Sequence, residues 1–503
     1  MGVGMVDICA KRSGLSPDRI AMRDVLSGKS VSYSELNTQA ERCAAMLQAH
    51  GAEAGARVAV LCRNRIEFFE VMFACAKVGA ILVPLNWRMP AAELKPLLDD
   101  CTPRVLIHGK EDAATAHDLH RPGLTAFDLD EPHSYAAALR QAGARRPVDV
   151  ALNDPWSLLY TSGTTGAAKA VIQTHQMALV NYMHTVQAFG VREHDHCANF
   201  LPLFHTGGIQ LVTLPTLIAG GVVSVLPGMD AEQLINLLPS LDVFFGVPAI
   251  YQQLAEHPTF ERADFSRVRA WGCGGAPLAD VLVERFAAKG ALVCNGYGMT
   301  ETGPTAFVGS PEIALSKVGS VGKPQILLEA RIVGKDGEDA PNGAEGEIWM
   351  RGPGVTPGYW RKPEANAETF TADGWLKSGD LGRRDADGCY YVVARIKDMY
   401  ISGGENVFPA EVENVLARHP AVIEAAVVGV PDDVWGETGH AFVLLRPGAN
   451  ATPAELAQHC RTHLAAYKAP RGFTFVDDFP RTAAGKVRKG ELAPLKSRAS
   501  ASR

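Results

Sequence analysis

The stretch from Leu158 to Lys169 combines residue types that can hold phosphate. An apolar, strand-like run ends there in a segment of two glycines, four hydroxyl residues and one lysine. Glycine lets the backbone approach an anion closely, so that successive N–H groups can converge on phosphate oxygens, while the lysine adds a positive charge. The residues that could bind phosphate in this way are Thr161, Ser162, Gly163, Thr164, Thr165, Gly166 and Lys169.

Two other interpretations of this stretch have to be weighed. A P-loop needs a glycine directly before the lysine and a Ser or Thr directly after it. Here Ala168 and Ala170 flank Lys169, so the P-loop is rejected. A polar surface turn stays open from this stretch alone, because Ser, Thr and Gly are the ordinary residues of turns.

A second cluster follows the apolar run 291–294 and extends from Asn295 to Glu301. The glycines on both sides of Tyr297 free the backbone to present the ring as a flat face on which a base can stack. Thr300 offers a hydroxyl group, and the Glu301 carboxylate is the type of oxygen ligand that magnesium prefers. The alternative is an ordinary turn at a strand end with a packed tyrosine.

Three further segments are weak when each is taken alone. Asp380 follows a tight turn, where its carboxylate could accept hydrogen bonds from ribose hydroxyls, but Gly-Asp turns are common. The charged run 395–398 precedes a glycine turn at 401–406, and Lys486 ends a turn near the C-terminus. A solvated surface lysine is the default interpretation of Lys486.

Length and composition indicate a large folded protein with more than one domain. The chain has 503 residues, beyond the size at which a single core keeps growing. Its hydrophobic content of 47% and charged content of 21% are ordinary for a folded protein. A net charge of −6 argues against a general nucleic-acid binder, which needs a basic surface.

Cysteine usage favours a reducing compartment, and we expect a cytoplasmic protein. The ten cysteines show no C-x-x-C pair and no disulfide framework. His194, His196 and Cys197 are of metal-binding types, but no fourth ligand stands at a recognisable spacing, so no metal site is predicted there. The N-terminus lacks the pattern of a signal peptide.

The uncharged stretch 197–229 raises the question of a membrane span. Prolines and glycines interrupt it repeatedly, so a buried helix followed by a buried strand is the better interpretation.

The wider pattern predicts an α/β fold with buried, mostly parallel strands. Short runs rich in Val, Ile and Leu alternate with longer helical patterns through the first two-thirds of the chain. The predicted strands are 57–61, 80–84, 105–108, 222–226, 243–245 and 292–295, and the predicted helices are 33–51, 66–78, 231–238 and 278–290.

After about residue 327 the pattern changes to short alternating strands and glycine-rich turns. Strands at 330–333, 345–351 and 388–394 predict a β-rich subdomain packed beside the sheets. A compact unit at 396–492 follows, with helices predicted at 410–418 and 453–465 and a strand at 425–430.

In their order and spacing, these five segments resemble the adenylate-forming superfamily of acyl-CoA synthetases, luciferases and peptide-synthetase adenylation domains. The resemblance covers nearly the whole chain and looks closest to bacterial feruloyl- or coumaroyl-CoA and fatty acyl-CoA ligases. Further matching segments are 202–205, 274–277, 358–360 with 363–364, and 467–470.

The resemblance implies the domain division and the fold class. It implies an α/β N-terminal adenylation domain at 1–394, built of stacked, mostly parallel sheets with helices and a β-rich subdomain at about 328–394. A hinge at 395–397, matching Lys397, would connect it to a small mobile α+β domain at 398–503.

The resemblance also implies a role for each matching residue. The 161–169 loop would hold the β- and γ-phosphates of ATP, Thr300 would contact the α-phosphate, and Glu301 would bind magnesium. The remaining ATP-binding residues that it implies are Gly275, Ala276, Pro277, Asn295, Gly296, Tyr297, Gly298, Met299, Asp380 and Arg395. Ala168 and Ala170 stand where the family usually has proline and glycine, which predicts a slightly looser loop.

Lys486 matches the catalytic lysine of the family. A cation between the substrate carboxylate and the α-phosphate would offset the repulsion of two anions that must meet. By resemblance, the C-terminal domain then rotates and replaces Lys486 with the Gly403–Gly404 turn, which would line a tunnel for the coenzyme A thiol.

The acyl pocket is implied by position. Its expected residues lack arginine, which disfavours a dicarboxylate, and a base role for His205 stays open. They are His205, Thr206, Gly207, Leu211, Phe245, Val247, Gly274, Pro304 and Thr305.

The expected activity is that of an AMP-forming carboxylate–CoA ligase that uses ATP, magnesium and coenzyme A. An aromatic acid such as ferulate or coumarate is the favoured substrate, and a medium- or long-chain fatty acid is the alternative. An enzyme that feeds a separate carrier protein and a non-catalytic nucleotide-binding scaffold also stay open, as does the choice between monomer and homodimer. No nucleic-acid partner and no membrane span are expected.

Overall fold

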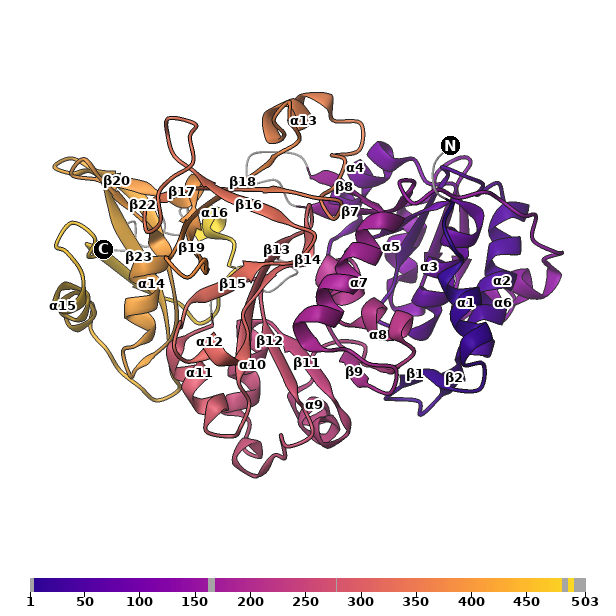
Figure 1. Cartoon of the computed structure of the whole chain (residues 1–503), viewed down its shortest axis with the longest axis horizontal. Helices are drawn as coiled ribbons and strands as arrows, with labels where there is room; N and C mark the ends of the chain where they lie inside the picture. Colours follow the sequence, from indigo (N-terminus) through magenta and orange to yellow (C-terminus); the bar gives the residue numbers. More distant parts are fainter. Residues whose placement is uncertain (1–3, 162–167, 277, 482–486, 493–503) are drawn as a thin grey trace.

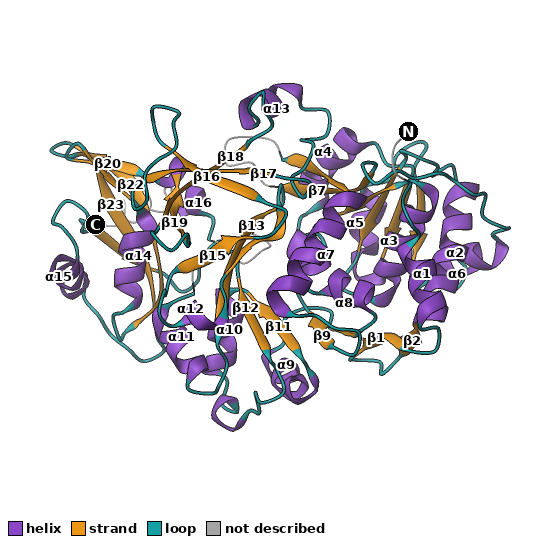
Figure 2. Ribbon diagram, in the orientation of Figure 1, coloured by secondary structure: helices purple, strands orange, loops and turns teal. Residues whose placement is uncertain are grey.

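The computed structural model describes residues 4–161, 168–276, 278–481 and 487–492 (Figure 1). Within these residues the chain forms four sheets, which helices cover and separate (Figure 2). Of the helices in the described ranges, none is both long enough and apolar enough to cross a membrane. The mixed α/β architecture with parallel strands confirms the fold class predicted from the sequence.

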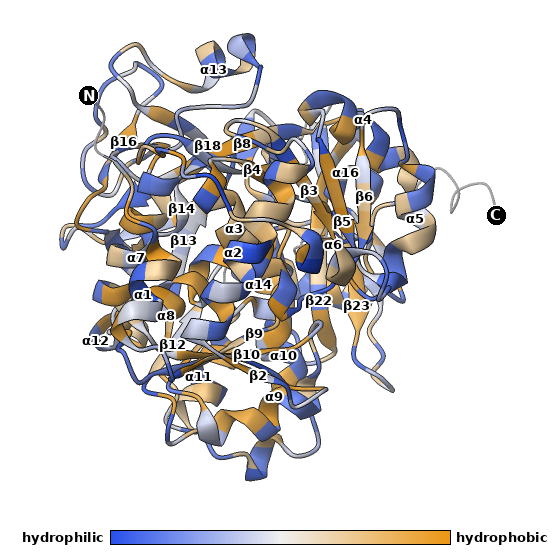
Figure 3. Ribbon diagram, turned by 90° about the vertical axis from the view of Figure 1, so that its right-hand side faces the viewer, coloured by the Kyte–Doolittle hydropathy of each residue, from blue (hydrophilic) through white to orange (hydrophobic). Residues whose placement is uncertain are grey.

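The first sheet carries the predicted phosphate segment on one edge. The strands β3 to β7 run parallel, and β8 returns antiparallel beside β7. The apolar runs that predicted β3 and β5 are buried almost throughout, and Figure 3 shows both strands in hydrophobic colours. In spatial order the strands are β6 (Thr125–Asp128), β5 (Val105–His108), β3 (Arg57–Leu61), β4 (Ile81–Pro84), β7 (Pro155–Thr161) and β8 (Lys169–Thr174).

The second sheet contains part of the uncharged stretch. In spatial order its strands are β2 (Ser30–Ser32), β1 (Ile20–Asp24), β10 (Val222–Val225) and β9 (His196–Asn199). The predicted buried helix and strand are present as α8 (Thr213–Ala219) and β10. Strand β9 was not predicted, because His196 and Asn199 interrupt its apolar pattern. The ring of His196 bonds the Ser240 carbonyl through Nδ1 and the Ser224 hydroxyl through Nε2.

The third sheet corrects one expectation about the β-rich segment. The segment does not pack beside the parallel strands but continues their sheet, because β14 turns back antiparallel on β13 and its free edge pairs with β15. In spatial order the strands are β11 (Val243–Gly246), β12 (Ala270–Cys273), β13 (Val293–Met299), β14 (Gly303–Val308), β15 (Ser320–Pro324), β19 (Tyr390–Arg395), β18 (Leu376–Arg384), β17 (Glu345–Arg351) and β16 (Glu329–Val333).

The C-terminal sheet has a core of its own, formed by residues such as Tyr400, Val412 and Val427. Helix α14 (Pro409–Ala417) packs on β22, and α15 (Pro453–His463) packs on α14. The strands are β21 (Glu405–Val407), β20 (Tyr400–Ser402), β23 (Gly436–Leu445), β22 (Val422–Asp432) and β24 (Gly472–Phe475), the last parallel to β23.

The predicted helices of the first two-thirds are present, with ends that differ by a few residues. Helix α2 (Tyr33–Ala49) begins at a capping box of Ser32 and Glu35, and α3 (Ile66–Val78) ends at Gly79, whose φ is 67°. The other α-helices are α1 (Ile8–Leu15), α4 (Ala91–Cys101), α5 (Ala113–Asp118), α6 (Tyr135–Gln141), α7 (His175–Phe189), α9 (Ala231–Leu237), α10 (Pro248–Glu256), α11 (Asp280–Ala287), α12 (Pro311–Ala314), α13 (Pro363–Thr369) and α16 (Lys489–Leu492).

Candidate active site

The predicted phosphate loop connects the two strands of a hairpin. Thr161 at the end of β7 pairs with Lys169 at the start of β8, and the Thr161 hydroxyl donates to the Lys169 carbonyl at 3.3 Å. The hairpin therefore fixes both ends of the loop. The predicted contacts Ser162, Gly163, Thr164, Thr165 and Gly166 lie outside the described residues.

A chain of contacts leads from Lys169 of this hairpin through Tyr359 to Glu301. The Lys169 Nζ is 5.1 Å from the centre of the Tyr359 ring, and the Tyr359 hydroxyl donates to Glu301 Oε1 at 2.9 Å. The Glu301 carboxylate is buried, with 7% of the residue exposed. Tyr359 lies in the matching segment 358–360, for which the sequence alone predicted no role, although an aromatic hydroxyl between two matching motifs was the available signal.

The environment of Glu301 suits a divalent cation. Burial raises the pKa of this carboxyl group, and the hydrogen bond from Tyr359 opposes the increase. A buried carboxylate is costly without a positive partner, and magnesium prefers such oxygen ligands. The donor type and burial thus fit the predicted magnesium ligand, with Tyr359 as the group that orients it.

Replacement of Tyr359 by Phe should weaken the response to magnesium at low pH. Without the hydroxyl group, the pKa of Glu301 rises further, so fewer molecules carry the carboxylate as the pH falls toward that pKa. We expect about a fivefold increase in the magnesium concentration for half-maximal rate at pH 6, which corresponds to the loss of one hydrogen bond. Steady-state rates over magnesium titrations at pH 6 and pH 8 measure this effect.

The change should be smaller at pH 8, because a higher pH favours the charged form of Glu301 in both proteins. Tyr391→Phe is the matched control, because the Tyr391 hydroxyl bonds Asp385, in the connection between β18 and β19, at 3.3 Å. Equal magnesium titrations for wild type and Tyr359→Phe at pH 6 would contradict the assigned role.

Tyr297, Asp380 and Arg395 form a second group, in which Asp380 is buried, Tyr297 is partly buried and Arg395 is exposed. The Tyr297 hydroxyl donates to Asp380 Oδ2 at 2.6 Å, and Arg395 Nε lies 3.1 Å from Asp380 Oδ1. Asp380 and Arg395 are register partners in β18 and β19, so the sheet itself holds this pair. Burial and the Asp380 carboxylate raise the pKa of Tyr297 well above its usual value.

Both oxygens of Asp380 therefore have a protein partner before a nucleotide binds. A carboxylate oxygen accepts more than one hydrogen bond, so the predicted contact with ribose hydroxyls remains compatible with this geometry. The Tyr297 ring also packs against Phe307, with ring centres 5.7 Å apart. This ring contact and the hydrogen bond to Asp380 together hold the Tyr297 side chain.

The segment around Tyr297 is a strand rather than a turn after one. Strand β13 continues to Met299 and pairs antiparallel with β14, so Asn295, Gly296, Gly298 and Met299 are strand residues. A Cβ at Gly298 would lie 2.4 Å from the Gly303 carbonyl oxygen. The close approach of β13 and β14 therefore requires glycine at position 298, in addition to the backbone freedom that glycine gives beside Tyr297. The local sequence does not predict this strand extension, because two glycines are unfavourable inside a strand.

Gly275 and Ala276 follow β12 and are exposed beside this strand. Gly275 has a φ of 84°, a conformation that favours glycine, whereas Pro277 lies outside the described residues. Gly274 is buried, and a Cβ there would lie 3.0 Å from the Phe245 ring. Phe245 and Gly274 of the predicted acyl pocket are therefore in contact.

Of the remaining predicted acyl residues, Gly207 and Leu211 begin and end the short π-helix η2 (Gly207–Leu211), which directly follows His205 and Thr206. The ring of His205 is 4.7 Å from that of Phe204. Thr305 is buried, and its hydroxyl donates to Asn181 Oδ1 at 2.5 Å. Asn181 in turn donates to the Gln210 carbonyl of η2, so Thr305 supports η2 through Asn181. Val247 precedes α10, and Pro304 lies on β14 next to Thr305.

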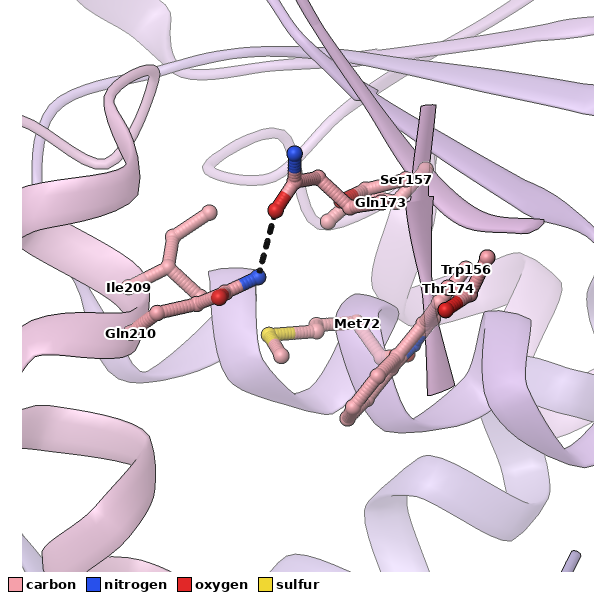
Figure 4. A pocket seen from close by; sticks show the side chains of 8 residues that line it. Met72, Trp156, Ser157, Gln173, Thr174, Ile209 and Gln210 are labelled. Carbon is pink, nitrogen blue, oxygen red and sulfur yellow. Dashed lines mark hydrogen bonds between the residues drawn. The ribbon is translucent and has the colours of Figure 1, made fainter. Parts of the chain in front are cut away.

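A cavity beside η2 is lined by none of the predicted acyl residues (Figure 4). It lies between η2, α3, β4, β7 and β8. Its lining residues are Met72, Leu82, Trp156, Ser157, Gln173, Thr174, Ile209 and Gln210. The Gln173 side chain connects it to the predicted catalytic loop, because its Nε2 donates to the Thr300 carbonyl at 2.7 Å.

The predicted hinge and coenzyme A turn lie in the C-terminal unit. Lys397 is in a single 3₁₀ turn at Ile396–Asp398, directly after Arg395. Gly403 and Gly404 connect β20 and β21 with φ values of 61° and 86°. A Cβ at Gly403 would lie 2.4 Å from the Trp435 ring, which gives a local reason for glycine in addition to the predicted tunnel.

The predicted catalytic Lys486 lies outside the described residues. An antiparallel β-bridge joins Arg481 and Val487, the described residues on either side of it. Arg481 also forms an ion pair with Glu424 of β22 at 2.5 Å. The C-terminal sheet therefore holds the start of the segment that contains Lys486.

Comparisons with known proteins match both units of the chain. The family described as AMP-binding enzyme matches residues 9–360, and the AMP-binding enzyme C-terminal domain matches residues 411–486. A feruloyl-CoA synthase of an Amycolatopsis species is 39% identical over 486 residues, covering 96% of this chain and 97% of that protein. A long-chain-fatty-acid–CoA ligase of Mycobacterium tuberculosis is 34% identical, covering 96% of each chain.

Solved structures agree with these matches in fold. The o-succinylbenzoate coenzyme A synthetase of Bacillus subtilis, solved in complex with ATP and magnesium ion, superposes with a TM-score of 0.88. It is 31% identical to this chain, and the match covers 98% of this chain and 100% of that one.

Proposed function

We propose, from the premise that this chain belongs to the AMP-binding enzyme family, that it activates an aromatic acid of the hydroxycinnamate class, such as ferulate or coumarate. The protein is an ATP-dependent acyl-CoA ligase of the AMP-forming type. The observation that carries the choice of acid is the 39% identity with a feruloyl-CoA synthase over nearly the full length of both chains.

The contact between Phe245 and Gly274 supports an aromatic acid. The Phe245 ring against Gly274 offers a flat apolar wall among the residues expected to line the acyl pocket. Aromatic and apolar walls with few polar groups are typical of sites for apolar ligands. A fatty acid is the second candidate, since a fatty-acid ligase is 34% identical to this chain.

In the proposed first step, the acid carboxylate attacks the α-phosphorus of ATP and pyrophosphate leaves. Lys169 and the loop before it bind the departing phosphates, while Tyr297, Asp380 and Arg395 hold the nucleoside. Thr300 contacts the α-phosphate, and Lys486 stabilises the charge that develops between the two anions. Magnesium at Glu301 neutralises phosphate charge when bound.

In the proposed second step, the coenzyme A thiol attacks the acyl carbonyl and AMP leaves, which gives the thioester. The proposed division into an adenylation domain at 1–394, a hinge at 395–397 and a mobile domain at 398–503 allows Lys486 to withdraw and Gly403–Gly404 to approach. The separate core of the C-terminal sheet supports such a division. We also propose a cytoplasmic location, where its ten buried free thiols would stay reduced.

A panel of acids tests this proposal. Acid-dependent AMP release is measured with coenzyme A for ferulate, coumarate, cinnamate, benzoate, decanoate and palmitate. The proposal predicts the highest kcat/KM for the hydroxycinnamates. A higher value for either fatty acid would instead establish the second candidate, and inactivity with every acid would overturn both.

A further inference from the structure

Two segments that are expected to bind ATP belong to different sheets. The phosphate loop ends at Lys169, where β8 of the first sheet begins, whereas Thr300 and Glu301 lie in the turn between β13 and β14 of the third sheet. Groups that act on the same triphosphate must keep a fixed relative position, because a small displacement lowers the rate strongly. Contacts between β8 and this turn must therefore hold the two segments in place.

Gln173 makes a direct contact between β8 and the turn. It is a residue of β8 and is 1% exposed. Its side-chain Nε2 donates to the Thr300 carbonyl oxygen at 2.7 Å. A backbone carbonyl can only accept, so the Gln173 amide must present its nitrogen, and not its oxygen, to Thr300. The contact itself therefore fixes the orientation of the amide.

The oxygen of the same amide is held as well. Gln210 Nε2 donates to Gln173 Oε1 at 3.2 Å, as the dashed line in Figure 4 shows. Gln210 is 4% exposed and lies on η2, where Asn181 Nδ2 donates to its backbone carbonyl. With a partner at each end, the Gln173 amide is in place before a nucleotide binds, and its contact with Thr300 requires no ordering during the reaction.

A second contact between β8 and the turn passes through Thr356. Its hydroxyl donates to the Ile172 carbonyl at 2.6 Å, and its backbone N–H donates to the Glu301 carbonyl at 2.7 Å. Thr356 is 3% exposed. Two neighbouring residues of β8 thus hold the two neighbouring carbonyls of the turn, one directly and one through Thr356. Contacts at both carbonyls prevent the turn from rotating about either one.

We propose that Gln173 is a positioning residue for formation of the acyl-adenylate, because its amide fixes the Thr300–Glu301 turn relative to the phosphate loop. This inference rests on the proposed function, in which Thr300 contacts the α-phosphate and Lys169 binds the departing phosphates. Gln173 acts through the Thr300 carbonyl and not through contact with a substrate. Without its N–H group the turn can shift, and a small shift misplaces the Thr300 hydroxyl at the α-phosphate.

Gln173→Met separates the hydrogen bond from the packing of the side chain. Methionine is an unbranched side chain of similar length, but it has no N–H group. We expect kcat for acid-dependent exchange between pyrophosphate and ATP to fall by about 10- to 100-fold, with the KM for ATP within about twofold of wild type. The acid is the one of the panel that gives the highest wild-type rate. A parallel loss of ATP affinity would indicate general damage to the site and would overturn the inference.

Gln173→His makes the opposite change. The imidazole differs from glutamine in shape, but its two nitrogens supply one donor and one acceptor, as the amide does. We expect kcat of Gln173→His to exceed that of Gln173→Met by at least about fivefold. If Gln173 only filled space, the methionine variant would be the more active of the two, because its shape is closer to that of glutamine. That order would overturn the inference.

Gln176→Met is the matched control, because Gln176 Nε2 also donates to a backbone carbonyl, that of Pro353, at 3.1 Å. This carbonyl lies outside the turn, so kcat and KM should stay at their wild-type values. Thermal melting curves establish whether each variant is folded. If Gln173→His fails to fold, Gln173→Met decides, and a wild-type kcat in it would overturn the inference alone. Inactivity of the wild-type enzyme with every acid of the panel would instead overturn the proposed function.

Discussion

Replacement of Lys486 by alanine is expected to lower the rate of acyl-adenylate formation by about 100- to 1000-fold, the usual effect of removing one electrostatic stabiliser of a transition state. The two reacting groups are both anions, so without the ammonium group their repulsion and the charge that develops at phosphorus are no longer offset. Acid-dependent exchange between pyrophosphate and ATP measures this first step alone.

The same variant should retain the second step. When chemically synthesised feruloyl-adenylate is supplied with coenzyme A, Lys486→Ala should form the thioester at nearly the wild-type rate. Lys489→Ala is the control, since Lys489 lies three residues further on and forms an ion pair with Glu413 at 2.6 Å. Near wild-type exchange in Lys486→Ala would show that the assigned role is wrong.

Replacement of Glu301 by glutamine is the second change with a large expected effect. The amide has nearly the same shape and can still accept the Tyr359 hydrogen bond, but it lacks the negative charge that attracts magnesium. We expect kcat/KM for ATP to fall by about 100- to 1000-fold, with a much higher magnesium requirement. Initial rates over a matrix of ATP and magnesium concentrations measure both quantities.

Glu368→Gln provides the control for loss of a carboxylate. Glu368 is exposed on α13, so its replacement should leave both quantities unchanged. If Glu301→Gln responded to magnesium as the wild type does, another group would have to bind the cation.

The sequence alone predicted the parallel strands well because their burial leaves a direct pattern. Strands β3 and β5 are continuous apolar runs, and glycine or a capping residue marks the ends of α2 and α3. The extension of β13 through Gly296 and Gly298 could not be predicted from local propensity. It depends on pairing with β14, which is a tertiary interaction.

The candidate site was only partly predictable for a similar reason. Lys169, Glu301 and Asp380 stand in recognisable motifs, whereas Tyr359 and Gln173 act through contacts with residues far away in the sequence. Thr305 is predicted to line the acyl pocket, and the structure adds that its hydroxyl bonds Asn181, a contact that the sequence does not reveal. Only the fold shows which face of a segment a side chain occupies.

The stoichiometry of a single reaction tests the central claim most directly. Wild-type enzyme is incubated with coumarate, ATP, magnesium and limiting coenzyme A, and the nucleotide and acyl products are quantified by liquid chromatography and mass spectrometry. The account predicts one AMP and one coumaroyl-CoA for each coenzyme A consumed, with pyrophosphate as the other product. Release of ADP and phosphate, or formation of AMP with no thioester, would contradict it.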